Sequence, residues 1–215
     1  MYEYIPQELL SAGTETSSIT LEWAMSELLA NPHVLAKLRA ELDQVVGLDR
    51  WVEHSDIPHL PYLQAVVKET FRKHPPVPLL VPHMSSQTSH VGGYLIPKGT
   101  RLYVNTWAIG HDPEVWEDPH LFLPDRFLRQ EGTDHVEVNG NHFQLLPFGS
   151  GRRMCPGMGF GMSIVQLTLS TLVHSLEWEL CPGQDKEEDM DSDELGFVCH
   201  RVQPLLVLPP RSRLP

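Results

Sequence analysis

The residue with the clearest potential for chemistry is Cys155, which lies in the glycine-rich, basic stretch 148–157. Apolar residues recur at roughly helical spacing over residues 158–180, which predicts a helix that begins just after the cysteine. The unpaired N–H groups at the start of that helix, and the cations of Arg152 and Arg153, favour a thiolate over a thiol. A thiolate with N–H groups aimed at its sulfur suits a haem iron as axial ligand when O–O cleavage is the task. An inert structural cysteine in a glycine-rich turn is the alternative interpretation.

A second unusual segment, residues 12–18, reads Ala-Gly-Thr-Glu-Thr-Ser-Ser inside a helical pattern. Glycine costs about 1 kcal/mol relative to alanine in a helix, and Ser and Thr compete for backbone hydrogen bonds, so such a cluster often marks function. Ala12 and Thr16 share one helix face and leave room for a flat ligand, while Gly13 tolerates a local opening of the helix. Thr16 offers a hydroxyl, and Glu15 a carboxyl group about 100° around the helix. The alternative is a polar-faced helix with a packing glycine.

The composition narrows the possible classes of protein. The 215 residues are 41% hydrophobic, which fits a globular chain with a sizeable core. There are 16 Lys and Arg against 28 Asp and Glu, and the formal net charge of -12 argues against nucleic acid as a partner. The three cysteines show no paired C-x-x-C spacing, so neither a disulfide framework nor a zinc ribbon is indicated. No apolar run reaches the ~20 residues of a membrane span, and the start shows no signal peptide.

Hydrophobic periodicity indicates which elements position these side chains. Helices are predicted over residues 7–30, 32–46, 62–73 and 158–180. Residues 90–108 are rich in β-forming side chains around a Gly92-Gly93 turn, which predicts a hairpin. Short strands are expected over residues 196–198 and 204–208.

The cysteine stretch has the spacing Phe-x-x-Gly-x-Arg-x-Cys-x-Gly, and here the chain resembles the cytochrome P-450 family of haem-thiolate monooxygenases. Residues 12–16 are similar to the family's motif of a small residue, Gly, any residue, an acid and Thr. The resemblance implies the cytochrome P-450 fold, mainly α with a small β region. It covers nearly the whole chain but only the C-terminal half of the family's domain. Residues 1–215 are therefore expected to form the C-terminal portion of a single domain, with the N-terminal half and the membrane anchor absent.

The resemblance also implies haem b (iron protoporphyrin IX) as cofactor, with Cys155 as the axial ligand of the iron. Thr16 and Glu15 are then the catalytic pair on the oxygen-binding side, where Glu15 serves a proton relay. His83 and Arg153 are expected to meet a haem propionate, although for His83 a loop histidine with a local hydrogen bond is the alternative. The implied cofactor-binding set is Cys155, Arg153, His83, Phe148, Gly149, Gly157, Ala12 and Gly13. The implied substrate contacts are Val77, Leu79, Leu80 and Phe197.

Glu69 and Arg72 are neighbours at i, i+3 on the helix predicted over residues 62–73, and Arg126 follows in a Pro-Asp-Arg-Phe segment. An ordinary surface ion pair, worth little, is one interpretation. The family instead buries such a pair and closes it with an Arg from a Pro-x-Arg-Phe segment. The resemblance therefore implies a structural triad of Glu69, Arg72 and Arg126 behind the cysteine loop, and loss of one member is expected to be severely destabilising.

The residue pattern around the cysteine looks most like plant microsomal members that hydroxylate specialised metabolites. The implied reaction is hydroxylation of a small organic substrate of phenolic, flavonoid or terpenoid type, with O2 and with electrons from an NADPH-cytochrome P-450 reductase. The parent enzyme is expected at the cytosolic face of the endoplasmic reticulum membrane, held there through the N-terminal anchor. Two alternatives stay open: a truncated, non-catalytic haem-binding fragment, and a reductase-independent isomerase or dehydratase. Enzymes of the latter kind typically lack the oxygen-activating Thr, so Thr16 argues for monooxygenation.

Overall fold

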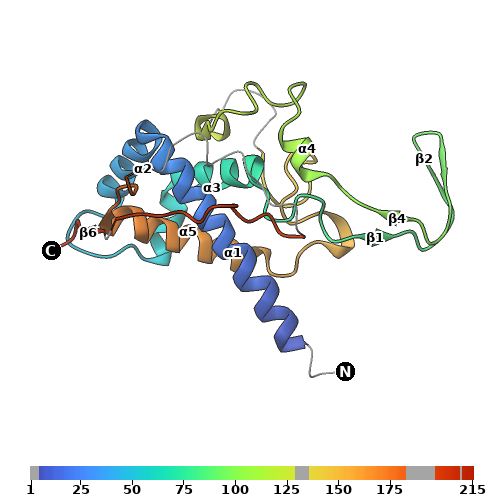
Figure 1. The fold of residues 1–215 in the computed structure, drawn as a ribbon, viewed down its shortest axis with the longest axis horizontal. Helices are drawn as coiled ribbons and strands as arrows, with labels where there is room; N and C mark the ends of the chain where they lie inside the picture. Colours follow the sequence, from blue (N-terminus) through green and yellow to red (C-terminus); the bar gives the residue numbers. More distant parts are fainter. Residues whose placement is uncertain (1–4, 129–135, 183–196, 209) are drawn as a thin grey trace.

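The computed structural model describes residues 5–128, 136–182, 197–208 and 210–215, which form a mainly helical fold with three small sheets (Figure 1). Its body consists of α1 (Ile5–Ala30), α2 (Pro32–Val45), α3 (Pro61–Lys73) and α5 (Met158–Ser175). Helices α1, α2 and α3 all pack against α5, and they also contact one another. The predicted fold class, mainly α with a small β region, is confirmed.

The core lies where these helices meet. Each contributes apolar side chains that are fully buried, among them Leu28, Leu38, Leu42, Leu63 and Leu169. Burial of one such side chain stabilises the fold by roughly 1.5–3 kcal/mol, so the apolar stripes decide how the helices are arranged.

Helix α1 has two contrasting halves. Between Ile19 and Leu29 its apolar side chains are buried apart from the half-buried Leu21, whereas Leu9 and Leu10 are exposed. The first half of the helix extends beyond the helical body, as Figure 1 shows. The polar cluster of residues 12–18 lies at the transition between the two halves.

The helix ends show where tertiary contacts override local pattern. Helix α2 ends before Gly47, whose φ of +80° is the left-handed conformation that favours glycine at this position. Helix α5 ends at Ser175, five residues before the predicted end at Leu180, so that prediction is wrong. The backbone N–H of Arg213 donates to the carbonyl oxygen of Ser175 at 2.8 Å, and Leu176 is already extended. Pairing with the C-terminal segment therefore replaces the last predicted helical turn.

Three antiparallel strand pairs make up the β region of the described residues. They are β1 (His83–Met84) with β4 (Arg101–Leu102), β2 (Ser89–Val91) with β3 (Tyr94–Ile96), and β5 (Leu176–Glu177) with β6 (Arg211–Ser212). The hairpin predicted at Gly92-Gly93 is β2–β3, and the positive φ of both glycines suits a tight hairpin turn. Residues 101–102 do not extend that hairpin, because they pair with β1 instead.

The strands predicted over residues 196–198 and 204–208 are wrong where the structure describes them. Phe197 and Val198 lie in a bend, and Val207 forms only an isolated bridge with Leu180. Gly196 lies outside the described residues. The C-terminal segment is instead held by side chains of α1, which local sequence pattern does not reveal.

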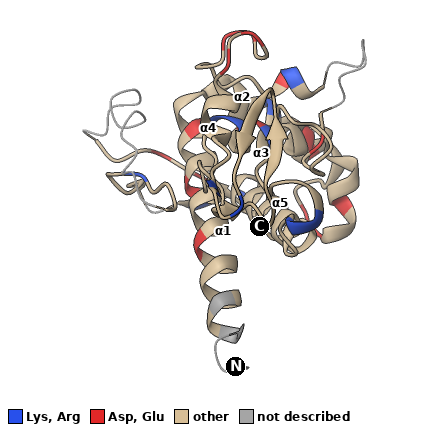
Figure 2. Cartoon of the chain, turned by 90° about the vertical axis from the view of Figure 1, so that its right-hand side faces the viewer, with Lys and Arg blue, Asp and Glu red and all other residues tan. Residues whose placement is uncertain are grey.

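Short helical turns connect these elements. They are α4 (Thr106–Gly110) and the 3-10 turns η1 (His54–His59), η2 (Pro124–Phe127) and η3 (Gly151–Arg153). In the part of the chain that the structure describes, no helix is both long and apolar enough to cross a bilayer. Acidic and basic residues are interspersed over the face seen in Figure 2.

Candidate functional site

The cysteine loop, residues 148–157, contains η3 and leads directly into α5. The backbone N–H of Cys155 donates to the carbonyl oxygen of Phe148 at 2.9 Å, which closes the loop, and the Cys155 side chain is exposed. Gly149 and Gly151 have φ values of +73° and +70°, so both turns require glycine. Helix α5 begins at Met158 with Gly157 at its N-cap, so the sulfur lies next to the start of a helix, as the sequence predicts.

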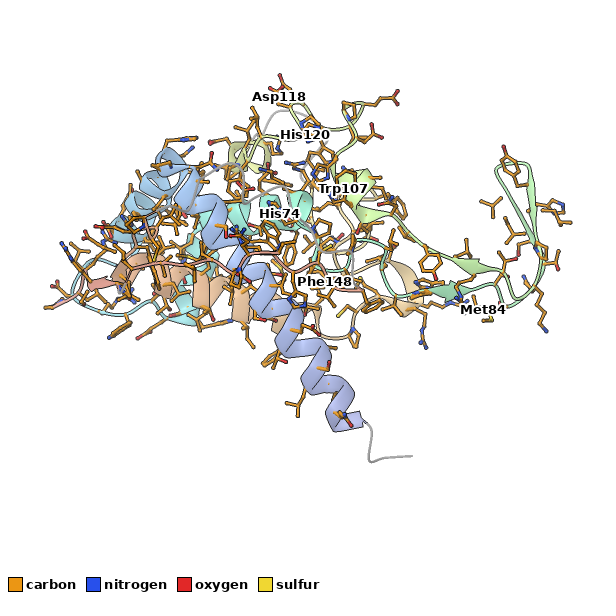
Figure 3. The ribbon with its side chains drawn as sticks, in the orientation of Figure 1. His74, Met84, Trp107, Asp118, His120 and Phe148 are labelled. Atoms are coloured by element: carbon orange, nitrogen blue, oxygen red, sulfur yellow. The ribbon has the colours of Figure 1, made fainter. Side chains whose placement is uncertain are left out.

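This loop has neighbours on two sides. The ring of Phe148, which Figure 3 labels, meets Phe71 of α3 edge-on, with 5.3 Å between the ring centroids. A Cβ built on Gly149 would lie 3.6 Å from Cδ1 of Leu80. The loop therefore packs against α3 on one side and against the predicted substrate-contact segment on another.

That segment forms a turn, in which the N–H of Leu80 donates to the carbonyl oxygen of Val77 at 3.1 Å, and it is held by the chain near α4. The N–H of Thr106 donates to the carbonyl oxygen of Pro78 at 2.8 Å, and the N–H of Val104 to that of Leu79 at 3.3 Å. Leu80 has a φ of +50°, a strained conformation for a side chain of this size, and it faces the cysteine loop. Leu79 is exposed and Val77 is half-buried, while Phe197 is exposed on the C-terminal segment.

The two residues predicted to meet haem propionates lie on separate elements. His83 is on β1, opposite Leu102, and Arg153 is on η3 beside Arg152. All three of these basic side chains are exposed. Exposed nitrogen donors are suitable partners for carboxylates.

The polar cluster of α1 is helical throughout. The hydroxyl of Thr16 donates to the carbonyl oxygen of Ala12 at 2.7 Å, and that of Ser17 to Gly13 at 2.8 Å. Ala12 and Gly13 are exposed, and a Cβ built on Gly13 would have no heavy atom within 4 Å outside its own helix. The helix continues through Gly13, and there is open space beside this glycine.

Glu15 has a partner that the sequence did not reveal. Its carboxylate lies 3.1 Å from Nε2 of His200, and both side chains are about half exposed. The two residues are 185 positions apart, and neither spacing nor composition connects them. This contact joins the acidic position of α1 to the C-terminal segment.

Two further contacts attach that segment along α1. The indole N–H of Trp23 donates to the carbonyl oxygen of Cys199 at 3.2 Å, and Glu22 accepts from the N–H of Leu205 at 2.9 Å. Figure 1 shows the C-terminal segment crossing α1. Phe197, a predicted substrate contact, is therefore close in sequence to residues that bind α1 directly.

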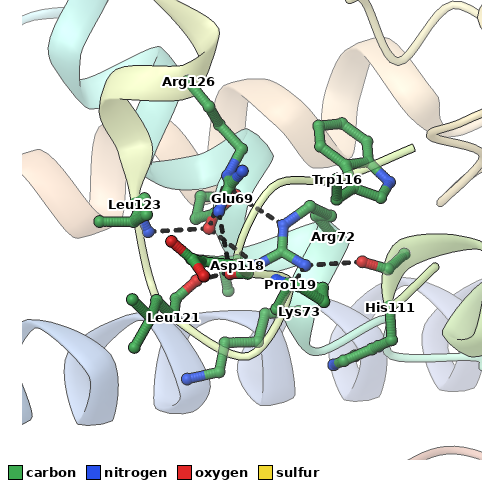
Figure 4. A network of polar contacts seen from close by, with 12 residues as sticks. Glu69, Arg72, Lys73, His111, Trp116, Asp118, Pro119, Leu121, Leu123 and Arg126 are labelled. Atoms are coloured by element: carbon green, nitrogen blue, oxygen red, sulfur yellow. Dashed lines mark hydrogen bonds and ion pairs between the residues drawn. The ribbon is translucent and has the colours of Figure 1, made fainter. Parts of the chain in front are cut away.

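A buried charge network lies on α3 (Figure 4). Arg72 and Glu69 are both 0% exposed and form a two-pronged ion pair with N–O distances of 2.8 Å. The guanidinium also donates to the carbonyl oxygens of Gly110 (2.6 Å), Pro119 (2.8 Å) and Leu121 (3.1 Å). All five N–H groups of Arg72 have an acceptor, which is the condition under which a buried charge is tolerated.

Glu69 is paired from its other side as well. Arg126 of η2 donates from Nε to the Glu69 carboxylate at 3.2 Å, and the N–H of Leu123 donates at 2.8 Å. Both guanidinium groups lie over the ring of Trp116, at 5.6 and 5.8 Å from its centroid. The structure therefore brings Glu69, Arg72 and Arg126 together in the interior, and the pair is not an ordinary surface ion pair.

A second buried carboxylate joins α1 to the end of α3. Glu27 lies 2.6 Å from Nε2 of His74 and 2.7 Å from Nζ of Lys73, and His74 stacks on Trp23 with 4.0 Å between centroids. Burial by itself raises the pKa of Glu27, but the hydrogen bond and charge of His74 and the charge of Lys73 outweigh burial, so the pKa is lowered. This pair holds the buried half of α1 against α3.

His111 lies next to the α3 network. Its Nδ1 is 2.8 Å from the carbonyl oxygen of Trp107, and the two rings stack with 4.4 Å between centroids. Burial lowers the pKa of His111 to about 4, and the positive charge of Arg72 acts in the same direction. His111 is therefore a neutral imidazole beside a guanidinium at neutral pH.

The cysteine loop fits the haem that the cysteine pattern implies. The exposed sulfur lies at the start of α5, and a Cβ built on Gly151 would meet nothing within 4 Å, so a flat ligand can approach the loop backbone. The described residues assemble no group of three or more His, Cys, Asp or Glu side chains that could hold a metal ion. A single thiolate as the protein's ligand to a porphyrin-bound iron is consistent with this donor set.

Comparison with known proteins identifies the family. The family model "Cytochrome P450" matches residues 6–208. A flavonoid 3',5'-hydroxylase of Crocosmia x crocosmiiflora is 48% identical over 201 residues, which are 94% of this chain and 38% of that protein. An iridoid oxidase of Catharanthus roseus is 50% identical over 203 residues, again 94% of this chain and 38% of that protein. The chain thus spans about two fifths of the length of these curated relatives.

A solved structure shows the same fold. A zebra fish cytochrome P450, described as a structure with abiraterone, superposes with a TM-score of 0.81 at 36% identity and covers 94% of this chain and 46% of its own. The sequence matches and this superposition agree with the haem-thiolate pattern around Cys155. The chain belongs to the cytochrome P450 family, whose cofactor is haem b.

Proposed function

We propose that residues 1–215 form the C-terminal portion of a cytochrome P450 domain that oxygenates a small organic molecule of plant specialised metabolism. The observation that carries this proposal is the exposed sulfur of Cys155, placed by a closed glycine loop at the start of α5. The named activities of the relatives, flavonoid hydroxylation and iridoid oxidation, support a phenolic, flavonoid or terpenoid substrate.

In this proposal Cys155 is the protein's ligand to the haem iron. The loop presents this sulfur at the start of α5. Gly149 and Gly157 keep side chains away from the loop, and Phe148 anchors it to α3. Arg153 and His83 would bind a haem propionate. When bound, thiolate-ligated haem supplies the activation of O2 and the insertion of one oxygen atom into a C–H bond.

On the opposite side, Ala12 and Gly13 leave room for the porphyrin and for O2. The Thr16 hydroxyl, which donates to the carbonyl oxygen of Ala12, would turn to donate a hydrogen bond to the O2 substrate. Glu15 passes a proton to this position, and His200 orients its carboxylate. The i−4 hydrogen bond of Thr16 is local and exchanges for a ligand at little cost, which supports this role.

The substrate is held by apolar side chains from two segments. Val77, Leu79 and Leu80 come from the turn beside the cysteine loop, and Phe197 from the C-terminal segment. Such side chains suit an apolar ring system more than a charged one.

Electrons reach the haem from an NADPH-cytochrome P450 reductase, and the enzyme works at the cytosolic face of the endoplasmic reticulum. Arg152 is exposed next to the cysteine loop, where a cation suits an acidic partner. The Thr16 hydroxyl supports monooxygenation over reductase-independent isomerisation, because oxygen activation requires a hydrogen-bond donor at this position.

The test is the CO difference spectrum of the dithionite-reduced protein, expressed from its complete transcript. We expect the Soret band of thiolate-ligated haem, which disappears in Cys155→Ser and persists in the matched control Cys181→Ser. Product formation that requires both NADPH and reductase then separates a monooxygenase from an isomerase. A thiolate signature that survives in Cys155→Ser would overturn the proposal.

A further inference from the structure

The segment that precedes the cysteine loop, residues 136–141, makes contacts that neither the sequence pattern nor the family match explains. We call it the brace. Val136, Val138 and Gly140 are buried, and they alternate with the polar residues Glu137, Asn139 and Asn141. The brace is in direct contact with the backbone of the cysteine loop, through Gly140.

Gly140 has a φ of +79° and no room for a side chain. A Cβ built on it would lie 2.9 Å from Sδ of Met154, 3.0 Å from the carbonyl oxygen of Gly149 and 3.2 Å from Cα of Ser150. The Met154 thioether is flexible and can move aside. The other two atoms belong to the loop backbone, so any side chain at position 140 displaces the loop itself.

A hydrogen bond also keeps the loop from moving away from the brace. The hydroxyl of Ser150 donates to the carbonyl oxygen of Gly140 at 2.6 Å. The brace therefore prevents the loop both from approaching and from moving away at residues 149–150. Five residues further on, the sulfur of Cys155 is held by the loop that these contacts position.

The brace is held in place at its N-terminal end, residues 136–138, by contacts with the helical body. Lys68 of α3, whose side chain is only 6% exposed, forms an ion pair with Glu137 at 2.6 Å. Val136 and Val138 belong to the hydrophobic core. A side chain added at Gly140 would therefore move the cysteine loop and leave the brace in place.

We propose that Gly140, together with Ser150, is a positioning residue that sets the place of the Cys155 sulfur relative to the haem. The role rests on the proposed haem-thiolate function. Gly140 acts through the loop backbone and does not itself contact the cofactor or substrate. A displacement of a few tenths of an ångström at Gly149 changes how the thiolate meets a fixed porphyrin, because metal ligation tolerates little error in distance.

The first experiment measures the loop without reference to haem. Hydrogen exchange is followed at the Cys155 amide, which donates to Phe148. We expect exchange to be about tenfold faster in Gly140→Val than in the unmodified protein, with Gly140→Ala between them. The matched controls are Gly99→Ala and Gly99→Val, because Gly99 has a φ of +84° and nothing within 4 Å of a built Cβ. These controls carry the same left-handed strain without the collision and should leave the Cys155 amide unchanged.

The second experiment measures ligation. Among haem-loaded proteins, the fraction with the thiolate-type CO signature should fall several-fold in Gly140→Val and less in Gly140→Ala, and it should be unchanged in the Gly99 variants. Ser150→Ala should give a smaller loss, which Ser150→Thr restores because it keeps the hydroxyl. If Gly140→Val does not fold, Ser150→Ala decides, since it adds no atom.

The outcomes separate this inference from the proposed function. Gly140 variants that behave like the Gly99 variants in both experiments would overturn the positioning role. Equal losses at both glycines would also overturn it, because backbone strain alone would then explain them. If the unmodified protein shows no thiolate signature, the proposed function fails, and the effect on ligation fails with it.

Discussion

The network on α3 and the polar cluster on α1 place polar side chains on helices of the same chain in opposite ways. On α3, Glu69 and Arg72 are 0% exposed, and every N–H of the guanidinium has an acceptor within the fold. On α1, Thr16 is half-buried and bonds only to the preceding turn of its own helix. The first arrangement is complete without a ligand, whereas the second contributes little to the fold and is open to one. The difference indicates that structural and functional polar groups are distinguished by where their hydrogen bonds go.

The largest effect should come from breaking the α3 network. Arg72→Met leaves Glu69 buried with fewer partners. It also removes the guanidinium that donates to the carbonyl oxygens of Gly110, Pro119 and Leu121. We expect a loss of about 3–5 kcal/mol in the free energy of unfolding, measured by urea denaturation. The control is Lys37→Met, which removes the surface ion pair of Lys37 with Asp125, where the two side chains are 50% and 58% exposed. This substitution should lower the free energy of unfolding by no more than about 1 kcal/mol. Similar losses in the two variants would contradict the contrast.

Gly110 offers a smaller disturbance of the same region. A Cβ at this position would collide with the carbonyl oxygen of Arg72, which is backbone of α3. Gly110→Ala should therefore destabilise the protein by about 1–3 kcal/mol through overpacking. The midpoint of urea unfolding measures this effect, and an unchanged midpoint would show that α4 moves aside without cost.

The same region should make stability depend on pH. The pKa of His111 is lowered to about 4 from an ordinary value of 6.5, so between these values the unfolded chain binds more protons than the folded one. The free energy of unfolding should therefore fall as the pH is lowered from about 6.5 to about 4. His111→Phe keeps the ring stacked on Trp107 and should flatten this slope. His33→Gln, at an exposed position, is the control, and a slope that persists in His111→Phe would assign it to another group.

The smallest effect, and the one of opposite sign, is expected in the α1 cluster. Gly13→Ala adds a methyl group where nothing lies within 4 Å, and it removes the conformational cost of a helical glycine. The free energy of unfolding should rise by about 0.5–1 kcal/mol. Gly13→Ala and Gly110→Ala add the same methyl group at an open and at a crowded glycine, so their effects on stability can be compared directly. A loss of stability in Gly13→Ala would mean that the first half of α1 is packed.

Local pattern predicted much of the fold. Apolar periodicity identified α1, α2 and α3 to within a few residues, and the Gly92-Gly93 turn identified the β2–β3 hairpin. The end of α5 was missed because the N–H of Arg213 takes the carbonyl oxygen of Ser175, a pairing between distant residues that periodicity does not report.

The site likewise contains residues that local pattern predicted and residues that it missed. The cysteine loop and the Glu69–Arg72 pair have short, specific spacings that a sequence displays directly. His200 and Gly140 have none, because their importance arises from partners brought close only by folding. Gly140 lies in a stretch that reads as polar loop, and only the collision at its Cβ shows how closely two backbones approach. The roles assigned to the site residues remain predictions.

The arrangement around Arg72 also links an irregular stretch of chain to α3. The stretch from Gly110 to Leu123 has little regular secondary structure, yet one guanidinium binds it at Gly110, Pro119 and Leu121. Because those hydrogen bonds tie the stretch to α3 at three points, we expect it to open together with that helix. A protease that samples brief openings should therefore cut this irregular stretch as rarely as it cuts the helix, although it resembles an ordinary surface loop in sequence.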